Sequence, residues 1–554
     1  MFAFDLVDEA WIPVLTVEGR AVVSLRESLI NAHRYVGLAL DSPIEAIAVF
    51  RQVLLPVYLD AVFREPGCPL PRDGTQWAHL WNHQDLDVTP PWAPAQVAAS
   101  GHDGPIPSYL TRHRDQFGLF GDRPFAQVAG LRTGKDETKP VSLLIASAAS
   151  GNNVPLFSAR TEGDPPALSP AEAIRAVLAT QCWDTAAIKS GAVDDPSVKG
   201  GKTTGNPTGP LGMIGVVWPV GRTLAETLLL HVPVSAGFDP TDRPQWQATG
   251  PADDPAHHAT WRRRHARGLL DLLTWQARRI RLVPETGPNG ATVVRRVVLT
   301  AGDRLERTPQ ADPHAAWRMS KQSKEQVPVR HTVGQAAWRG MLPLLATVEG
   351  STHGLSTPVL RGIRQRQDEG RIAESYPLRV VTIGTQYGNQ SAVVEDAIVD
   401  QLPLPVAALN NDRDVFRLLE DMVAQAEELR GAANRLGDDL RQAAGGEKLP
   451  WDRGQRVGDR MVHEFTPTVR RVLSGLQRDP GRVGEAELAW RAEARRVAWA
   501  TADQVLSASP PVAFLGRAAD ARTIHRSSLA EVWFRTKVRK ILGDPPPVTP
   551  SGGA

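Results

Sequence analysis

Cysteine is almost absent from this chain, which has 554 residues and only two thiols, at Cys68 and Cys182. Two thiols cannot build a disulfide framework or a four-thiolate zinc site. We therefore expect a protein of a reducing compartment, the cytoplasm. We also expect no metal and no cofactor.

A targeting signal and a large net charge are missing as well. The first residues, MFAFDLVDEAW, carry acids where a secretory signal peptide needs basic side chains. We find no apolar run long enough to cross a bilayer, and we expect no membrane partner. Lysine and arginine total 63 against 61 for aspartate and glutamate, so any surface that binds nucleic acid must be local.

Glycine is concentrated in residues 183–218, which contain seven glycines and three prolines. Neither a helix nor a central strand can run through such a stretch, so we expect a long loop. Lys189, Lys199 and Lys202 lie in this loop, where bare backbone N–H groups favour an anion-binding surface. Long loops in compact domains are usually functional or disordered. We expect this loop to be ordered against nucleic acid, and a disordered surface insertion is the alternative.

A phosphate-binding P-loop is the enzymatic alternative, because Gly201-Lys202-Thr203 resembles the end of that motif. Pro196 stands where the motif needs its first glycine, and Asn206-Pro207 follows where a helix should begin. His102-Asp103 suggests a metal-dependent nuclease but lacks companion ligands. These departures disfavour a P-loop NTPase or another hydrolase.

Three Ser/Thr-x-x-Glu capping boxes predict helices that begin after Ser42, Ser169 and Thr223. We expect the first helix to run to about residue 63 with a kink at Pro56. The other two end near residues 182 and 230, so they enclose the glycine-rich loop. A loop held between two well-specified helices is more consistent with an ordered segment than with a floppy linker.

Arginine is frequent in residues 261–282. We expect a basic helix over residues 261–276, followed by a strand at 280–282 and a hairpin through Asn289-Gly290 to a strand at 292–299. A basic outer face could contact phosphates, although a solvated surface explains it at least as well.

A strand at residues 378–383 leads into the sequence QYGNQS at 386–391. Asn389, Gln390 and Ser391 lie at the tip of this predicted turn. Asn and Gln side chains offer donors and acceptors without charge, so they could read the edges of a DNA minor groove or enter a base step. A tight surface turn without function is the simpler alternative.

The composition changes near residue 401 to alanine, leucine, arginine and glutamate. Apolar residues spaced by three and four predict four helices and hence a four-helix bundle. The expected class is α+β, with a mixed α/β domain at 1–400 and a bundle domain with a disordered tail at 401–554. The last helix is basic and could lie along a phosphate backbone.

Eight motifs in order connect the chain to a known family. They are FDLVDEAWIPV, DRPFAQV, NNVPLF, AAIKSG, KGGK, TWQARRI, ADPHAAW and QYGNQS. With the C-terminal helices they resemble the large subunit of Cascade, the type I-E CRISPR surveillance complex. The resemblance spans essentially the whole chain.

The resemblance implies a subunit that is not an enzyme and that recognises the protospacer-adjacent motif (PAM) of duplex DNA from the minor groove. Lys199, Gly200, Gly201 and Lys202 match the family's glycine loop at this motif. Asn389, Gln390 and Ser391 match the wedge that starts strand separation and R-loop formation. Lys321 and Lys324 correspond loosely to a lysine that the family uses beside the motif.

Further partners follow from the same resemblance. Asn152, Asn153 and Phe157 match a loop that docks on the foot of the complex near the 5′ handle of the guide RNA. The backbone, foot and small subunits, the target DNA and a trans-acting helicase-nuclease are the implied partners. Some family members carry zinc-binding cysteines in the hairpin region, but residues 283–293 have none, so we expect no zinc. A purely structural scaffold subunit remains an alternative.

Overall fold

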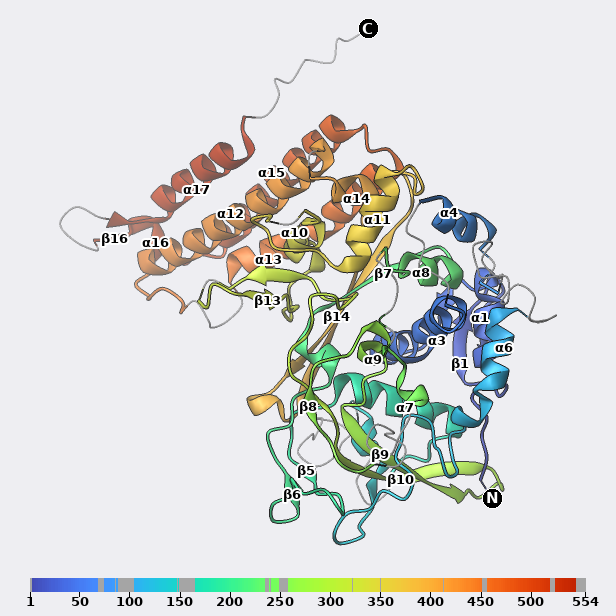
Figure 1. Ribbon diagram of the computed structural model, residues 1–554. Coiled ribbons are helices and arrows are strands. Elements are labelled where there is room, and N and C mark those ends of the chain that lie inside the picture. Colours follow the sequence, from blue (N-terminus) through green and yellow to red (C-terminus); the bar gives the residue numbers. More distant parts are fainter. Residues whose placement is uncertain are drawn as a thin grey trace. The chain divides into compact units, whose positions relative to one another are not determined.

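The computed structural model (Figure 1) describes most of the chain. The described residues are 2–67, 74–84, 86–87, 104–146, 148, 165–234, 239, 241–248, 258–320, 322–348, 350–411, 413–450, 456–518 and 524–544. The chain divides into two units, Met1–Gln335 with Ala346–Ile372 and Leu378–Gln401, and Ala336–Leu345 with Ala373–Pro377 and Leu402–Ala554. Two short segments before residue 401 thus group with the C-terminal part, which no sequence pattern indicated.

The first unit is built on a long buried helical run. It consists of α2 (Pro43–Val49), a π-helical turn (Phe50–Leu54), α3 (Leu55–Leu59) and a second π-helical turn (Asp60–Arg64). The wide turn before Pro56 lets the helix continue past a residue that cannot donate a hydrogen bond. Ser42 makes no side-chain cap, so that predicted capping box is wrong; Glu45 instead lies 3.6 Å from Arg175.

This helical run also corrects one expectation. Pro43–Arg64 is long and apolar enough to cross a membrane by length and composition: its most apolar window of 18 residues has a mean hydropathy of 1.6 and is entirely buried in the protein. The statement that no apolar run reaches this length is therefore wrong. Burial of this kind is typical of a core helix.

A mixed sheet packs on α7 (Pro170–Trp183), which also packs against α2 of this helical run. Strands β9 (Arg278–Thr286) and β10 (Thr292–Ala301) form the predicted hairpin, and Gly290 takes the positive φ of 75° that its turn requires. β10 also pairs with β4 (Lys139–Pro140) and, in parallel, with β5 (Lys189–Ser190), which pairs with β6 (Lys202–Thr203). The predicted capping box at Ser169 is confirmed, because Ser169 and Glu172 cap α7 (Pro170–Trp183) reciprocally.

A second sheet carries the predicted amide-tipped turn. Its strand order is β15-β14-β7, from β7 (Val216–Val220), β14 (Arg379–Tyr387) and β15 (Val394–Pro403). β7 precedes α8 (Leu224–Leu230), whose N-cap Thr223 accepts a hydrogen bond from the backbone N–H of Glu226. The turn between β14 and β15 is a short 3-10 segment at Asn389–Ser391.

The predicted basic helix at residues 261–276 is wrong. The chain there forms the two-residue strand β8 (Arg263–Arg264) and the short helix α9 (Leu269–Leu273). Arg264 lies 2.5 Å from Asp271 and 2.9 Å from Asp303, and Arg279 lies 2.8 Å from Asp303. Asp271 within the segment and Asp303 beyond it therefore draw these arginines into ion pairs.

The second unit contains the predicted bundle. Its helices are α12 (Asp414–Ala443), α13 (Val457–Glu464), α14 (Thr466–Arg478), α15 (Val483–Ser507) and α17 (Ser527–Leu542), with Pro467 in the first turn of α14. Two basic residues of α17 are paired, Arg535 with Asp503 at 2.8 Å and Lys537 with Glu428 at 3.2 Å. These pairs weaken the prediction that α17 follows a phosphate backbone.

The remaining elements complete the chain. They are β1 (Ile12–Leu15), β2 (Arg20–Val23), α1 (Leu25–Ile30), β3 (Gly37–Leu38), α4 (Gly74–His83), α6 (Pro105–Arg112), β11 (Arg304–Leu305), β12 (Trp317–Met319), β13 (Gln326–Pro328), α10 (Leu342–Leu345), α11 (Pro358–Asp368), α16 (Val512–Leu515), β16 (Arg517–Ala518) and β17 (Ile524–His525).

Candidate nucleic-acid interface

The KGGK sequence forms a two-residue hairpin turn at the beginning of β6. The N–H of Lys199 donates to the carbonyl of Lys202 at 3.0 Å, and the N–H of Lys202 donates back at 3.1 Å. Gly200 and Gly201 have φ of 57° and 76°, the two positive values of a type I′ turn, which glycine adopts without strain. All four residues are exposed, so a bare backbone turn projects between two lysines.

The rest of the glycine-rich stretch is anchored to the protein. Ala192 bridges Thr133, and the N–H of Val193 donates to the carbonyl of Arg132 at 3.0 Å. A side chain at Gly191 would lie 2.4 Å from Val198, so only glycine fits there. The predicted long loop is present, but β5, β6 and the beginning of β7 interrupt it, because short strands fit between its glycines.

Lys189 is not part of the exposed surface. Its side chain is 8% exposed, and its Nζ lies 2.8 Å from the carboxylate of Asp184, which also pairs with Arg278. Burial lowers the pKa of Lys189. Burial opposes ionisation of Asp184 too, yet Lys189 and Arg278 hold the pKa of Asp184 below its ordinary value. The prediction that Lys189 contacts DNA is therefore wrong, because its ammonium neutralises a buried carboxylate.

Arg278 closes the base of the loop. Its guanidinium donates to the carbonyls of Thr185 and Pro207, both at 2.7 Å, as well as to Asp184. Gln181 in turn accepts from the backbone N–H of Arg278 at 2.9 Å. One buried cation thus holds together the start and the end of the loop, which leaves the intervening turn exposed on a fixed base.

The second predicted projection is an exposed, tightly constrained turn. Gln390 and Ser391 have φ of 54° and 53°, in the left-handed region that residues other than glycine rarely adopt. The N–H of Gly388 donates to the carbonyl of Val393 at 3.0 Å, and the N–H of Ser391 donates to that of Gly388 at 2.8 Å. Asn389 and Gln390 are exposed at the tip.

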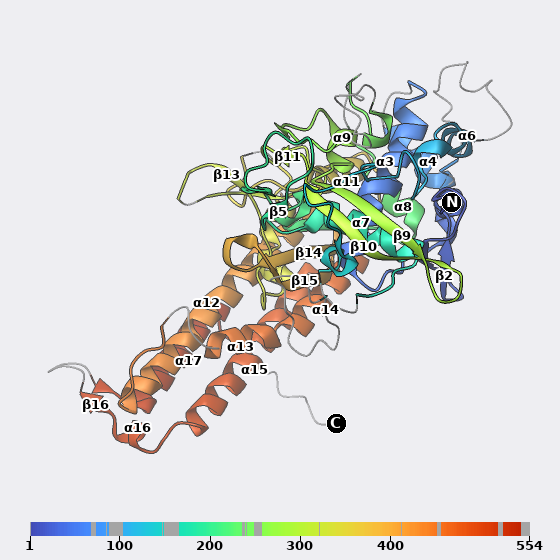
Figure 2. The ribbon, with the colours of Figure 1, turned by 90° about the horizontal axis from the view of Figure 1, so that it is seen from below.

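The two projections share a base. The N–H of Ala186 donates to the carbonyl of Ser391 at 2.8 Å, and the hydroxyl of Tyr387 donates to the carbonyl of Trp183 at 2.6 Å. Burial raises the pKa of Tyr387, so this hydroxyl stays protonated as a donor. Figures 1 and 2 show the turn after β14 beside the segment that carries β5. The structure therefore joins the roots of the glycine loop and the amide-tipped turn.

Arg304 is a residue of this surface that the sequence did not single out. Its guanidinium donates to the carbonyl of Thr204 at 2.7 Å and to Asn206 at 3.2 Å, and it lies 3.7 Å above the ring of Trp261. β11, which carries Arg304, pairs in parallel with β8, so exposed Arg263 lies beside it. If residues 263–264 had been predicted as a strand, Arg263 and Arg304 could have been placed side by side.

Five other predicted residues remain, and the structure describes one of them. Lys324 is exposed on the separate β12–β13 hairpin and has a φ of 58°. Lys321, Asn152, Asn153 and Phe157 lie outside the described residues.

The enzymatic alternatives find no support in the part of the chain that the structure describes. Lys202 lies in strand β6 and does not begin a helix, as a P-loop lysine must. The described residues contain no group of three or more His, Cys, Asp or Glu side chains that could hold a metal ion.

The chain is similar to known proteins over most of its length. The model of the family described as CRISPR-associated protein Cse1 matches residues 5–501. A CRISPR-associated protein CasA/Cse1 from Thermus thermophilus is 30% identical over 455 residues, which are 81% of this chain and 80% of the relative. The crystal structure of Thermobifida fusca Cse1 is 29% identical with a TM-score of 0.79 and 98% coverage of both chains. That of Acidimicrobium ferrooxidans Cse1 is 28% identical with a TM-score of 0.75 and the same coverage. The structural likenesses confirm the predicted mixed fold with a helical C-terminal region.

Proposed function

Since the chain belongs to the CRISPR-associated Cse1 family, we propose that it is the non-catalytic large subunit of a type I-E Cascade complex. In this role it recognises the PAM of duplex DNA from the minor groove and begins strand separation. Pairing with the guide RNA then reads the remaining target sequence. The observation that carries this proposal is the hydrogen bond of 2.8 Å between Ala186 and Ser391, which joins the roots of two exposed projections.

The glycine turn suits the minor groove. The groove is only about 6 Å wide, and Gly200 and Gly201 bring a backbone edge without side chains toward it. Lys199 and Lys202 flank this edge, where ammonium groups can contact the two phosphate backbones. Because the minor groove mainly distinguishes A·T from G·C pairs, we expect several related PAM sequences to be accepted.

The amide-tipped turn is suited to act as a wedge that separates stacked base pairs. Unstacking a base step costs a few kcal/mol, and donors and acceptors that bind the freed base edges offset that cost. Asn389 and Gln390 provide such groups on a turn whose backbone is held at both ends. Since the two turns share a base, a DNA duplex seated on the glycine turn lies at a fixed distance from Gln390.

The wider assembly follows from the family. We assign the chain to the cytoplasm, with the backbone, foot and small subunits, the 5′ handle of the guide RNA and the target DNA as partners. Cleavage belongs to the helicase-nuclease that docks after R-loop formation. Arg304 is the basic residue we place beside the PAM, because it binds the glycine loop directly.

The test is a comparison of two DNA substrates. Gln390→Ala should slow R-loop formation by the reconstituted complex at least tenfold on closed duplex, with little effect on a target already opened beside the PAM. Gln401→Ala, which changes an exposed glutamine of the same hairpin, is the matched control. Equal losses on both substrates would remove the wedge role of Gln390.

A further inference from the structure

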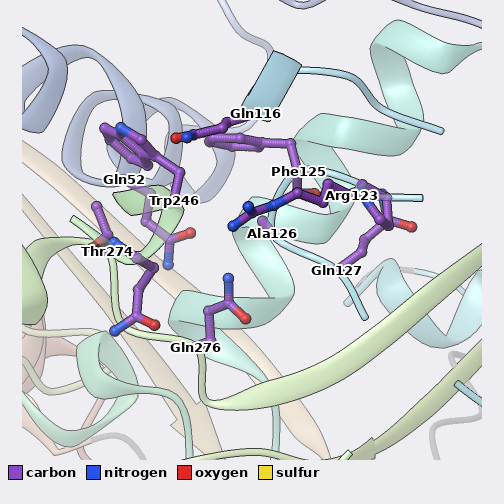
Figure 3. A pocket seen from close by; sticks show the side chains of 11 residues that line it. Gln52, Gln116, Arg123, Phe125, Ala126, Gln127, Trp246, Thr274 and Gln276 are labelled. Atoms are coloured by element: carbon purple, nitrogen blue, oxygen red, sulfur yellow. Dashed lines mark hydrogen bonds between the residues drawn. The ribbon is translucent and has the colours of Figure 1, made fainter. Parts of the chain in front are cut away.

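A small polar pocket lies in the first unit (Figure 3), and no residue of the two turns lines it. Five of its eleven lining residues are glutamines. Gln52, Trp246 and Gln276 are buried, whereas Gln116 and Arg123 are partly exposed. Figure 3 shows the polar ends of Gln52, Arg123 and Gln276 directed toward the middle of the pocket. The pocket thus has a buried polar floor and a rim that solvent reaches.

Hydrogen-bonding capacity is left unused in this pocket. Gln276 is 7% exposed, and its Oε1 has no hydrogen-bond partner among the described residues; the same holds for the buried Oε1 of Gln116. Gln52 differs from them, because its amide nitrogen donates to the Sγ of Cys182 at 3.3 Å and more weakly to the carbonyl of Trp275 at 3.5 Å. Buried carbonyl oxygens normally have a donor, so these two oxygens are available to a molecule that enters the pocket.

Another glutamine of the pocket, Gln127, has hydrogen-bond partners for both ends of its amide. Gln127 donates to the carbonyl of Leu119 at 2.9 Å and accepts from the N–H of Leu282 at 2.9 Å. Ala126 beside it has a φ of 56°, a left-handed conformation that tends to occur at binding sites. Gln127 also lines the pocket and is satisfied, whereas Gln116 and Gln276 each keep one oxygen without a donor among the described residues.

The size and the polar groups of the pocket favour a ligand with a small planar polar group. The space open to water centres is about 40 Å³, which corresponds to roughly three water molecules. A carboxamide has three non-hydrogen atoms, donates two hydrogen bonds and accepts two. Its N–H groups match the free oxygens of Gln116 and Gln276, and its oxygen can accept from Arg123. A carboxylate has the same shape but no donor for those oxygens.

We propose that this pocket binds a neutral planar carboxamide head group. The group comes either from an Asn or Gln side chain of a neighbouring protein chain or from a free small amide. The rings of Phe125 and Trp246 line the pocket beside it. This site is independent of DNA recognition, because neither the glycine turn nor the amide-tipped turn contributes to it.

The test uses acetamide and acetate, which share one shape and differ in donors and charge. Saturation-transfer NMR with the purified full-length chain should show a signal for the acetamide methyl group at least fivefold stronger than that for acetate. Gln276→Met, which keeps the length of the side chain, should abolish the acetamide signal. Gln401→Met, at an exposed position outside the pocket, should leave it unchanged. If Gln276→Met does not fold, Gln116→Met at the rim replaces it.

Two results would overturn the proposal. One is an acetate signal equal to the acetamide signal, and the other is an acetamide signal that survives both pocket variants. A crystal soaked in acetamide should show the amide on Gln276, and waters alone at that concentration would contradict the assignment. If N-acetylglutamine methylamide displaces acetamide, the natural ligand is an inserted Asn or Gln side chain. If acetamide binds and this compound does not displace it, the natural ligand is a free small amide.

Discussion

Asp184 lies between two buried cations at the base of the glycine loop, Lys189 and Arg278. Asp184→Asn removes the only carboxylate that the structure shows paired with these two groups. We expect the free energy of unfolding to fall by about 3–5 kcal/mol, because an uncompensated buried charge is strongly unfavourable.

Urea denaturation of the full-length chain measures this loss. Asp8→Asn is the matched control, because it changes a more exposed partner of Arg26 and should alter stability by less than about 1 kcal/mol. A loss for Asp184→Asn no larger than that of the control would show that the three groups are not coupled.

His231 gives the structure a predictable response to acid. Burial lowers its pKa to about 4 from the ordinary value near 6.5. Above pH 6.5 the ring is neutral in both states and has no effect on stability. Between pH 6.5 and 4 the unfolded chain takes up the proton and the folded chain does not, so the contribution becomes unfavourable as pH falls.

The free energy of unfolding should therefore decrease by about 2 kcal/mol between pH 6.5 and 5 on account of this single group. Comparing wild type with His231→Gln at pH 7 and pH 5 isolates the effect, since the variant lacks the titrating ring. Identical pH dependence in the two proteins would contradict the assignment to His231.

Individual residues were predicted from the sequence where local chemistry decides their position. The exposure of Lys199, Lys202 and Gln390 follows from glycine and asparagine beside them, which favour surface turns. The burial of Lys189 could not be predicted in this way, because Arg278, which shares its carboxylate, is distant in sequence. Arg304 was missed for the same reason: its partners Thr204 and Asn206 lie about a hundred positions earlier.

At the scale of the element, the type I′ turn depends on two glycines with positive φ. Gly201→Ala forces a Cβ into a conformation that costs about 1–2 kcal/mol, although the surrounding space is open. We expect the turn to change shape and the affinity of the reconstituted complex for PAM duplex to fall about tenfold, measured by filter binding.

Gly334→Ala is the control for this prediction. Gly334 has a φ of 73° and open space around it, like Gly201, but it lies outside both projections. It should lower stability to a similar extent without changing DNA affinity. Equal affinities for the two variants would show that the shape of the KGGK turn does not matter for binding.

Elements were predicted well where their signals are local. The box at Ser169, the turn at Asn289-Gly290 and the apolar seam of α12 each specify structure within a few residues. Residues 261–276 were mispredicted because their arginines have the spacing of a basic helix, while the ion pairs to Asp303 that decide the fold are made across the sheet.

At the scale of the whole molecule, a net charge of +2 requires the DNA-binding surface to be local. Each phosphate contact contributes about −0.9 to the dependence of log affinity on log salt. Replacing both Lys199 and Lys202 by Gln should therefore make this slope shallower by about 2, as measured with PAM duplex over a range of salt concentrations. An unchanged slope with unchanged affinity would favour a purely structural scaffold.

The central claim is that this chain selects the PAM for its complex. The most direct measurement is a binding assay against a library of randomised motifs, performed with the reconstituted complex in the presence and absence of this subunit. We predict that the complete complex enriches a small set of related motifs and that the complex without the subunit enriches none. The same enrichment with and without the subunit would contradict the claim.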